Sequence, residues 1–308
     1  MLRTPKAQTR DQVRDEMTAQ TTYKPARYYT WTYLITFVLL LIGAYVSRVN
    51  TTGLFLAFIV PATMTPFLVS LVMMLRSKDP SLKRDFGRRI VNLRLIAPKM
   101  LPIMLLLGPL LVVVSILLSL PFGGSIEQFR VSDGFSSAGV MIPGLVMLFV
   151  IASFEELGWR GYAFNSLQSH PKSFFKAALL FGVLWSLWHL PLVLVKDTYQ
   201  YQITQENIWF ALNFFISVIP LGILVSWIWV KNRRSILAAV LIHFLVNVSQ
   251  EAFSTTQSTK CIETVLLIAV TAVIVLLDRR LFFVAPNPMG GPLDHTAEPQ
   301  SSLAASGS

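Results

Sequence analysis

Eight long apolar stretches, separated by charged or Pro/Gly-rich segments, set the pattern of hydrophobic and polar positions along this chain. A helix needs about 20 apolar residues to cross roughly 30 Å of hydrocarbon, at about 1.5 Å of rise per residue. Apolar runs of this length, bounded in this way, are typical of membrane-spanning helices. The predicted spans are residues 31–47, 54–75, 100–120, 140–165, 174–195, 208–230, 236–252 and 264–284.

The amino-acid composition supports the same interpretation. Of the 308 residues, 54% are hydrophobic and 14% are charged, whereas soluble domains carry about 25% charged residues. We therefore expect an all-α fold, a polytopic membrane helix bundle with about eight transmembrane helices. Residues 1–30 are then a polar N-terminal tail, 31–285 the membrane domain, and 286–308, rich in Pro, Gly and Ser, a disordered C-terminal tail.

Two features of the sequence exclude other classes. The N-terminal tail contains no short apolar core followed by a small-residue cleavage site, so we expect no removable signal peptide. Cys261 is the single cysteine, which rules out an intramolecular disulfide and a cysteine-based zinc cluster.

The basic residues are divided unevenly between the two ends of the predicted spans. With the N-terminus in the cytoplasm, the N-terminal tail holds six Lys and Arg, the segment 76–99 holds eight, and three later inner segments hold three, three and two. Thus 22 of the 26 basic residues are cytoplasmic, as the positive-inside rule requires. The basic residues left on the outer side are Arg48, Arg130, Lys196 and Lys260.

The net charge of +10 follows from this topology, because the basic residues lie beside membrane spans. We therefore expect the lipid bilayer, and no nucleic acid, as the partner of these residues. Segment 76–99 either contacts anionic lipid headgroups or acts only as an orientation signal.

A few ionisable and amide side chains lie inside the predicted spans, where each costs several kcal/mol and usually marks function or pairing. They are concentrated in three spans, the fourth, fifth and seventh. The set is Glu155, Glu156 and Arg160 in FEELGWRGY, His189 in LWSLWHLPL, and His243 and Asn247 in LIHFLVN, with Asn213 as a lesser candidate.

The spacing of these residues distinguishes those suited to an ion pair from those suited to catalysis. Glu156 and Arg160 are four residues apart with the acid first, the favourable order for a helical ion pair. His243 and Asn247 are also four apart and share one helix face. Glu155 has no obvious partner on its own helix, which suits a general base. Taken singly, each histidine is more typical of an interhelical hydrogen bond than of catalysis, and only the combination on three spans favours catalysis.

These segments resemble the motifs of the CPBP family of intramembrane proteases, which includes type II CAAX prenyl endopeptidases and bacteriocin-processing or self-immunity proteins. EELGWRG matches the family's EExxxR motif, WSLWH resembles FxxxH, and HFLVN matches HxxxN. Their order, spacing and placement agree over roughly residues 140–250. Each motif alone is weak, and the ordered set is specific.

The resemblance implies a role for each catalytic candidate. Glu155 corresponds to the carboxylate that activates the attacking water, and His189 to its companion in holding that water. His243 and Asn247 correspond to donors that stabilise the oxyanion of the tetrahedral intermediate, typically worth about 3 kcal/mol each.

Three further residues correspond to supporting positions. Glu156 and Arg160 hold the geometry of the site. Trp185 stands where the family usually has Phe; the aromatic ring is retained, so we expect its packing role to survive.

The resemblance favours a metal-free mechanism, and we expect no cofactor. The chain contains no HExxH motif. The alternative is a zinc site built from Glu155, His189 and His243, a donor set that zinc accepts with one position open for water.

We therefore predict an intramembrane endopeptidase that hydrolyses a peptide or membrane-protein substrate, with short loops favouring a bacterial plasma membrane. The alternatives are a non-catalytic scaffold or bacteriocin-immunity protein with the same fold, and a transporter that uses these residues as a proton relay. No inverted repeat or pair of broken helices supports the transporter. Whether the substrate is prenylated stays open.

The charge distribution makes a testable prediction about orientation. In a Cys261→Ser background, a cysteine introduced within 125–135 is expected to react with a membrane-impermeant maleimide added to intact cells. A cysteine within 80–90 is expected to react only after the cells are opened, because this segment should be cytoplasmic. Labelling of 80–90 in intact cells would overturn the predicted orientation.

Overall fold

The computed structural model describes residues 23–50, 52–168 and 173–284. Within these ranges every regular element is a helix, apart from one isolated antiparallel bridge between Val131 and Phe253. The prediction of an all-α helix bundle is confirmed. The predicted polar and disordered tails fall mostly outside the described residues.

Eleven α-helices form the described part of the chain. They are α2 (Pro25–Val49), α3 (Leu56–Leu75), α4 (Pro80–Val91), α5 (Leu101–Ser119), α6 (Ala138–Gly158), α7 (Phe164–Gln168), α8 (Phe174–Trp188), α9 (Tyr199–Glu206), α10 (Ile208–Lys231), α11 (Ile236–Ala252) and α12 (Gln257–Leu277). Short 3-10 and π-helical turns extend several of them, including 3-10 turns at Leu120–Phe122 and Leu190–Leu194 and π turns at Trp159–Ala163 and Arg280–Val284.

Seven helical segments of the described chain are long and apolar enough to cross a membrane. They are Pro25–Val49, Leu56–Leu75, Pro98–Phe122, Ala138–Gln168, Phe174–Leu194, Ile208–Lys231 and Gln257–Leu277. The remaining predicted span, 236–252, coincides with α11, a shorter apolar helix of 17 residues. All eight predicted apolar stretches are therefore helical.

Two helix boundaries differ from the apolar pattern. Helix α2 begins at Pro25, inside the segment assigned to the polar tail, because proline suits the first helical turn and Tyr28 of the next turn is buried. Helix α12 begins at Gln257 and not at 264. Its first two turns contain Lys260 and Glu263, and these charged residues interrupt the apolar stretch without ending the helix.

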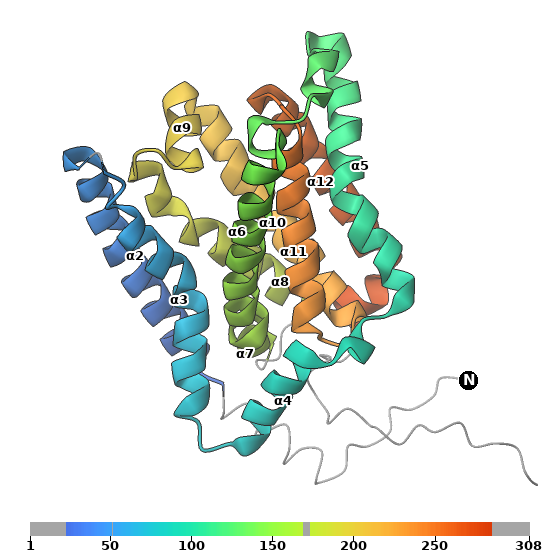
Figure 1. The fold of residues 1–308 in the computed structure, drawn as a ribbon. Coiled ribbons are helices and arrows are strands. Elements are labelled where there is room, and N and C mark those ends of the chain that lie inside the picture. Colours follow the sequence, from blue (N-terminus) through green and yellow to red (C-terminus); the bar gives the residue numbers. More distant parts are fainter. Residues whose placement is uncertain (1–22, 51, 169–172, 285–308) are drawn as a thin grey trace, which may run out of the picture.

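Helix α6 lies in the middle of the bundle, with α3 packed on one side and α11 on the other (Figure 1). Helix α8 packs along α10, and α5 and α12 lie beyond α11. The start of α2, helix α4 and the end of α12 lie at one end of the bundle (Figure 1). Helix α9 and the connection between α5 and α6 lie at the opposite end.

Small residues allow the central helices to approach closely. A side chain at Gly158 would place its Cβ 2.3 Å from the backbone of Pro66 in α3. A Cβ at Gly222 of α10 would lie 2.8 Å from the Cα of Gly182 in α8. Contacts this short need glycine, and such small-residue contacts are characteristic of helix packing in membranes.

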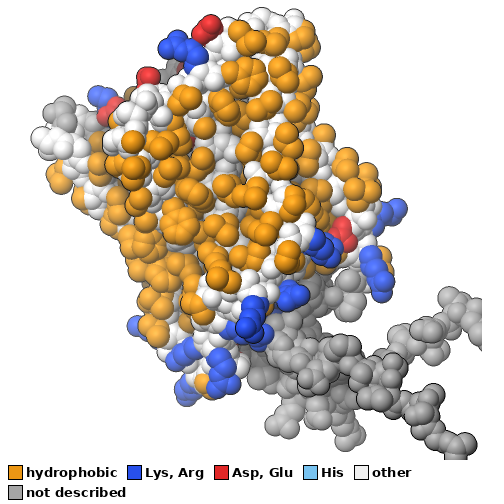
Figure 2. Space-filling view, turned by 45° about the vertical axis from the view of Figure 1, so that its right-hand side comes forward, with side chains coloured by type: hydrophobic (Ala, Val, Ile, Leu, Met, Phe, Trp, Pro, Cys, Tyr) orange, Lys and Arg blue, Asp and Glu red, His pale blue; other side chains and the backbone are white. Residues whose placement is uncertain are grey.

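The surface of the bundle is apolar around its middle. Figure 2 shows hydrophobic side chains over most of the visible face, with Lys and Arg gathered mainly toward one end. Large side chains such as Leu105, Leu110 and Val265 are more than half exposed. Contiguous exposed apolar surface of this extent is unfavourable in water and suits contact with lipid.

Candidate active site

The helix that carries EELGWRGY changes from an α-helix to a π turn within this motif. Helix α6 runs into a π turn at Trp159–Ala163, which continues into α7. A π turn widens the helix by one residue, leaves carbonyl groups without their usual partners, and is common at functional sites. Here Arg89 of α4 donates to two of these carbonyls, those of Arg160 at 3.1 Å and Gly161 at 3.2 Å.

Arg89 links α4 to the site as a charged group. Its Nε lies 2.9 Å from the carboxylate of Asp85, one turn earlier in α4. Burial lowers the pKa of the Arg89 guanidinium to about 10, which leaves it protonated near neutral pH. The amphipathic helix α4 therefore anchors the π turn from the end of the bundle.

A buried carboxylate joins α6 to α11. Glu156 Oε1 accepts a hydrogen bond from Arg160 Nη1 at 2.9 Å and lies 3.0 Å from His243 Nδ1. Glu156 and Arg160 are fully buried, and the Arg160 guanidinium lies 4.4 Å from the centre of the Phe181 ring in α8. The predicted Glu156–Arg160 pair is present, and a histidine from another helix completes it.

The neighbouring carboxylate of Glu155 has two indole partners. Its Oε2 accepts hydrogen bonds from Trp185 Nε1 at 2.8 Å and from Trp159 Nε1 at 3.3 Å. The expectation that Glu155 lacks a partner on its own helix is wrong, because Trp159 lies one turn further along the same helical segment. Neither bond uses Oε1, so the two indoles orient the carboxylate by one oxygen.

The two histidines have different partners for Nδ1. His189 follows the last residue of α8, and its Nδ1 lies 2.9 Å from the carbonyl oxygen of Trp185. A carbonyl oxygen only accepts, so Nδ1 of His189 is the donor and Nε2 is left as an acceptor in the neutral ring. His243 directs its Nδ1 to the carboxylate of Glu156 instead.

The four predicted catalytic residues line one cavity of about 410 Å³. Glu155 comes from α6, His189 from the end of α8, and His243 and Asn247 from α11. The predicted supporting residues Glu156, Arg160 and Trp185 are not among the lining residues. Glu156 contacts the lining residue His243, Trp185 contacts the lining residue Glu155, and Arg160 contacts Glu156 and Trp185. The structure thus brings all seven predicted site residues together.

The opposite wall of the cavity was missed from the sequence. It includes Lys260 and Glu263 of α12, Gln250 of α11 and Tyr199 of α9. Gln250 donates to the largely buried Glu263, and Lys260 Nζ lies 3.4 Å from the hydroxyl of Tyr199. The sequence analysis placed Lys260 on the outer side and began the last predicted span at residue 264, just after Glu263. Their spacing of three residues, followed by Leu267, places them on one helix face and was the available signal.

The zinc alternative would use Glu155, His189 and His243. Across the described ranges, no three His, Cys, Asp or Glu side chains gather closely enough to hold a metal ion. Oε2 of Glu155 is directed to two indole N–H groups, and Nδ1 of His243 to Glu156. These contacts do not use Oε1 of Glu155 or Nε2 of either histidine, so the absence of a metal from the mechanism stays a prediction.

Comparison with known proteins agrees with this geometry. Residues 137–249, which contain all three motifs, match the family model described as type II CAAX prenyl endopeptidase Rce1-like. The chain is also 48% identical over 262 residues to the CAAX prenyl protease 2 of Methanococcus maripaludis, across 85% of this chain and 96% of that protein.

A multi-pass helical bundle with these relatives is an integral membrane peptidase that works on peptide substrates within the bilayer. More particularly, the chain belongs to the Rce1-like family of type II CAAX prenyl endopeptidases. This membership favours the peptidase over the non-catalytic scaffold and the transporter, the two alternatives that the sequence left open.

The hydrogen bond that the indole N–H of Trp185 donates to Glu155 can be tested by Trp185→Phe, which keeps an aromatic ring and removes the N–H. Hydrogen bonds to charged groups contribute about 1.5–3 kcal/mol, so the cleavage rate is expected to fall about tenfold to a hundredfold. Trp229→Phe is the matched control. Trp229 is also fully buried, and its indole nitrogen has no hydrogen-bond partner among the described residues.

Both variants lose similar volume, so a comparison of kcat/KM and melting temperature in detergent separates the hydrogen bond from packing. Trp229→Phe is expected to keep the wild-type rate. A Trp185→Phe enzyme as active as wild type would show that the indole of Trp185 acts only by packing.

Proposed function

We propose that this CAAX-type peptidase hydrolyses its substrate with a water molecule activated by Glu155, without a metal ion. The observation that carries the proposal is the convergence of Glu155, His189, His243 and Asn247 on one cavity. These residues supply a base, a water acceptor and oxyanion donors, which are the groups that metal-free amide hydrolysis needs.

Glu155 and His189 form the water-activating half of the site in this mechanism. The two indole bonds to Oε2 leave Oε1 of Glu155 to take the proton from water. His189 donates through Nδ1 to the carbonyl of Trp185. Its Nε2 is therefore an acceptor that orients the second hydrogen of the same water. The water oxygen attacks the carbonyl carbon of the substrate as Oε1 of Glu155 takes the first proton of the water.

Asn247 and His243 form the oxyanion half. The side-chain amide of Asn247 donates a hydrogen bond to the developing oxyanion without any change of protonation. His243 donates through Nδ1 to Glu156, so its Nε2 donates to the oxyanion in the imidazolium form, with Glu156 as counter-ion. Collapse of the intermediate breaks the C–N bond, and Glu155 returns its proton to the leaving amine.

We propose a substrate whose C-terminus carries a CAAX-type sequence, as the name of the Methanococcus relative indicates. Cleavage within such a sequence releases a short peptide with a free carboxylate. Among the described residues that line the catalytic cavity, Lys260 is the only lysine or arginine. Its Nζ is held by Tyr199, 4.7 Å from the ring centre. We assign Lys260 to the C-terminal carboxylate of the substrate.

The water-activating role is tested by Glu155→Gln. This change keeps volume and hydrogen-bonding capacity but removes the base, so turnover is expected to collapse while the melting temperature stays near wild type. Asn247→Ala is expected to cost about a hundredfold to a thousandfold in rate, the usual effect of losing one oxyanion donor. Full activity of Glu155→Gln would disprove the proposed base.

Glu156→Gln provides the contrast for these variants. It breaks a buried ion pair with Arg160, which typically costs about 3–5 kcal/mol. Its melting temperature is therefore expected to fall together with its activity. If all three variants melt far below wild type, these residues are structural and the catalytic assignment fails.

Metal dependence is tested on the wild-type enzyme. After stripping, with metal content verified by elemental analysis, turnover is expected to be unchanged because the proposed base is a protein carboxylate. Loss of activity on stripping, followed by recovery with stoichiometric zinc, would instead make Glu155, His189 and His243 ligands.

The carboxylate assignment is tested with Lys260→Gln on two prenylated peptides that differ only in a free or amidated C-terminus. The wild-type enzyme is expected to prefer the free acid, and the variant to lose this preference through a higher KM for the acid alone. A preference that survives in Lys260→Gln would remove Lys260 from substrate recognition.

A further inference from the structure

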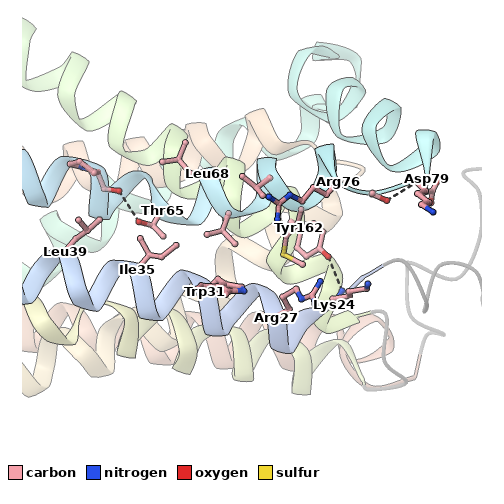
Figure 3. Close-up of a pocket in the computed structure, with 16 residues that line it drawn as sticks. Lys24, Arg27, Trp31, Ile35, Leu39, Thr65, Leu68, Arg76, Asp79 and Tyr162 are labelled. Atoms are coloured by element: carbon pink, nitrogen blue, oxygen red, sulfur yellow. Dashed lines mark hydrogen bonds between the residues drawn. The ribbon is translucent and has the colours of Figure 1, made fainter.

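A second and larger cavity, of about 1110 Å³, lies between α2 and α3 (Figure 3). The two helices are in contact where Gly43 lies against Phe58, and the groove occupies the other half of the pair. It shares no lining residue with the catalytic cavity. The groove is therefore a separate feature of the molecule.

The sides of the groove are apolar. Trp31, Ile35 and Leu39 line it from α2, and Leu68 and Val72 line it from α3 (Figure 3). Several of these side chains are open to the surroundings: Trp31 is 50% exposed, Leu68 42% and Val72 46%.

The groove has the length of a lipid chain. From Lys24 to Leu39 it follows α2 for 15 residues, which corresponds to about 22 Å of helix. The hydrocarbon of one leaflet is about 15 Å deep, half of the bilayer core. A single hydrocarbon chain from one leaflet fits along this length.

The mouth of the groove is basic. Lys24 and Arg27 lie at the start of α2, and Arg76, just after α3, faces them (Figure 3). Lys78, two residues further along the chain, also lines the groove. In the part of the chain that the structure describes, none of the four forms a salt bridge.

One acid, Asp79, is also among the lining residues. Its Oδ1 accepts from the backbone N–H of Ser81 at 2.9 Å and from the Ser81 hydroxyl, which caps α4. Four cations and one capping carboxylate leave a net positive mouth above an apolar groove.

We propose that this groove binds an anionic phospholipid. The phosphate lies among Lys24, Arg27, Arg76 and Lys78, and one hydrocarbon chain lies between α2 and α3. Charge complementarity identifies the occupant. A neutral lipid chain would match the apolar sides but would leave the basic mouth without a partner, whereas an anionic headgroup matches both.

The site also has a structural consequence. Helix α3 contacts the catalytic helix α6 through Pro66 and Gly158. The backbone N–H of Lys24 donates to the hydroxyl of Tyr162, which lies within the π turn that follows α6 and also lines the groove. A bound lipid therefore holds α2 and α3 against the helix that carries Glu155.

The proposal is tested by native mass spectrometry of the purified full chain with phosphatidylglycerol and with phosphatidylcholine. The wild type is expected to retain one phosphatidylglycerol and to release phosphatidylcholine. In Arg27→Gln/Arg76→Gln, phosphatidylglycerol binding is expected to weaken about 25-fold, since each basic residue contributes about fivefold near a charged membrane surface.

The matched control is Lys83→Gln/Arg84→Gln, which removes the same charge from exposed positions of α4 at the same end of the bundle. It is expected to bind phosphatidylglycerol as the wild type does. Leu68→Trp fills the groove and leaves the charges in place, so it is expected to lose the lipid as well. The melting temperature of all three variants in lipid-free detergent, compared with that of the wild type, reports that they fold.

A photo-crosslinking residue at Val72 identifies the occupant directly and is expected to capture phospholipid. Equal retention of phosphatidylcholine, equal weakening in the α4 control, or normal lipid binding by Leu68→Trp would overturn the proposal. Capture of a prenylated peptide, or of residues 1–22 of the chain itself, would do so too.

Discussion

The structure depends on one buried carboxylate, that of Glu156. It holds Arg160 of its own helical segment and His243 of α11. Arg160 in turn lies against Phe181 of α8 and donates to the carbonyl of Gly222 in α10. Removing any member leaves an uncompensated charge in a low-dielectric interior. Four helices are therefore held in one arrangement, and Glu155, one residue away and about 100° around the helix, is directed into the cavity.

The eight helical stretches and the clustering of the seven candidate site residues could be predicted because both leave local patterns in the sequence. The length of the apolar stretches identifies the spans. Polar residues within them are conspicuous, because placing a polar side chain in the membrane costs free energy. The partners of Glu155 were harder to predict, since the bond from Trp185 depends on how α8 meets α6. The cavity wall formed by Lys260 and Glu263 was not predicted, because charged residues at the start of α12 resemble the end of a loop.

The two histidines show what a motif leaves undetermined. Both appear as a histidine on an apolar helix, four residues from an aromatic or an amide side chain. The partner of Nδ1 distinguishes them: a backbone carbonyl for His189 and a carboxylate for His243. His189 makes this contact within its own helical segment, whereas His243 makes it with another helix, α6. Because the Nδ1 partner influences the protonation state of the ring, histidines with similar local sequences can differ in their chemistry.

The polar wall of the cavity and the basic side chains lie toward different ends of the bundle. Its polar wall, with Tyr199, Gln250 and Lys260, faces the end of the bundle that carries α9. The start of α2, helix α4 and most of the basic side chains lie at the other end. The two membrane faces are thus unequal for a substrate. Under the proposed function, we expect a substrate's polypeptide tail to approach Glu155 from the end that carries α9, so the insertion of this protein would also select the proteins it can process.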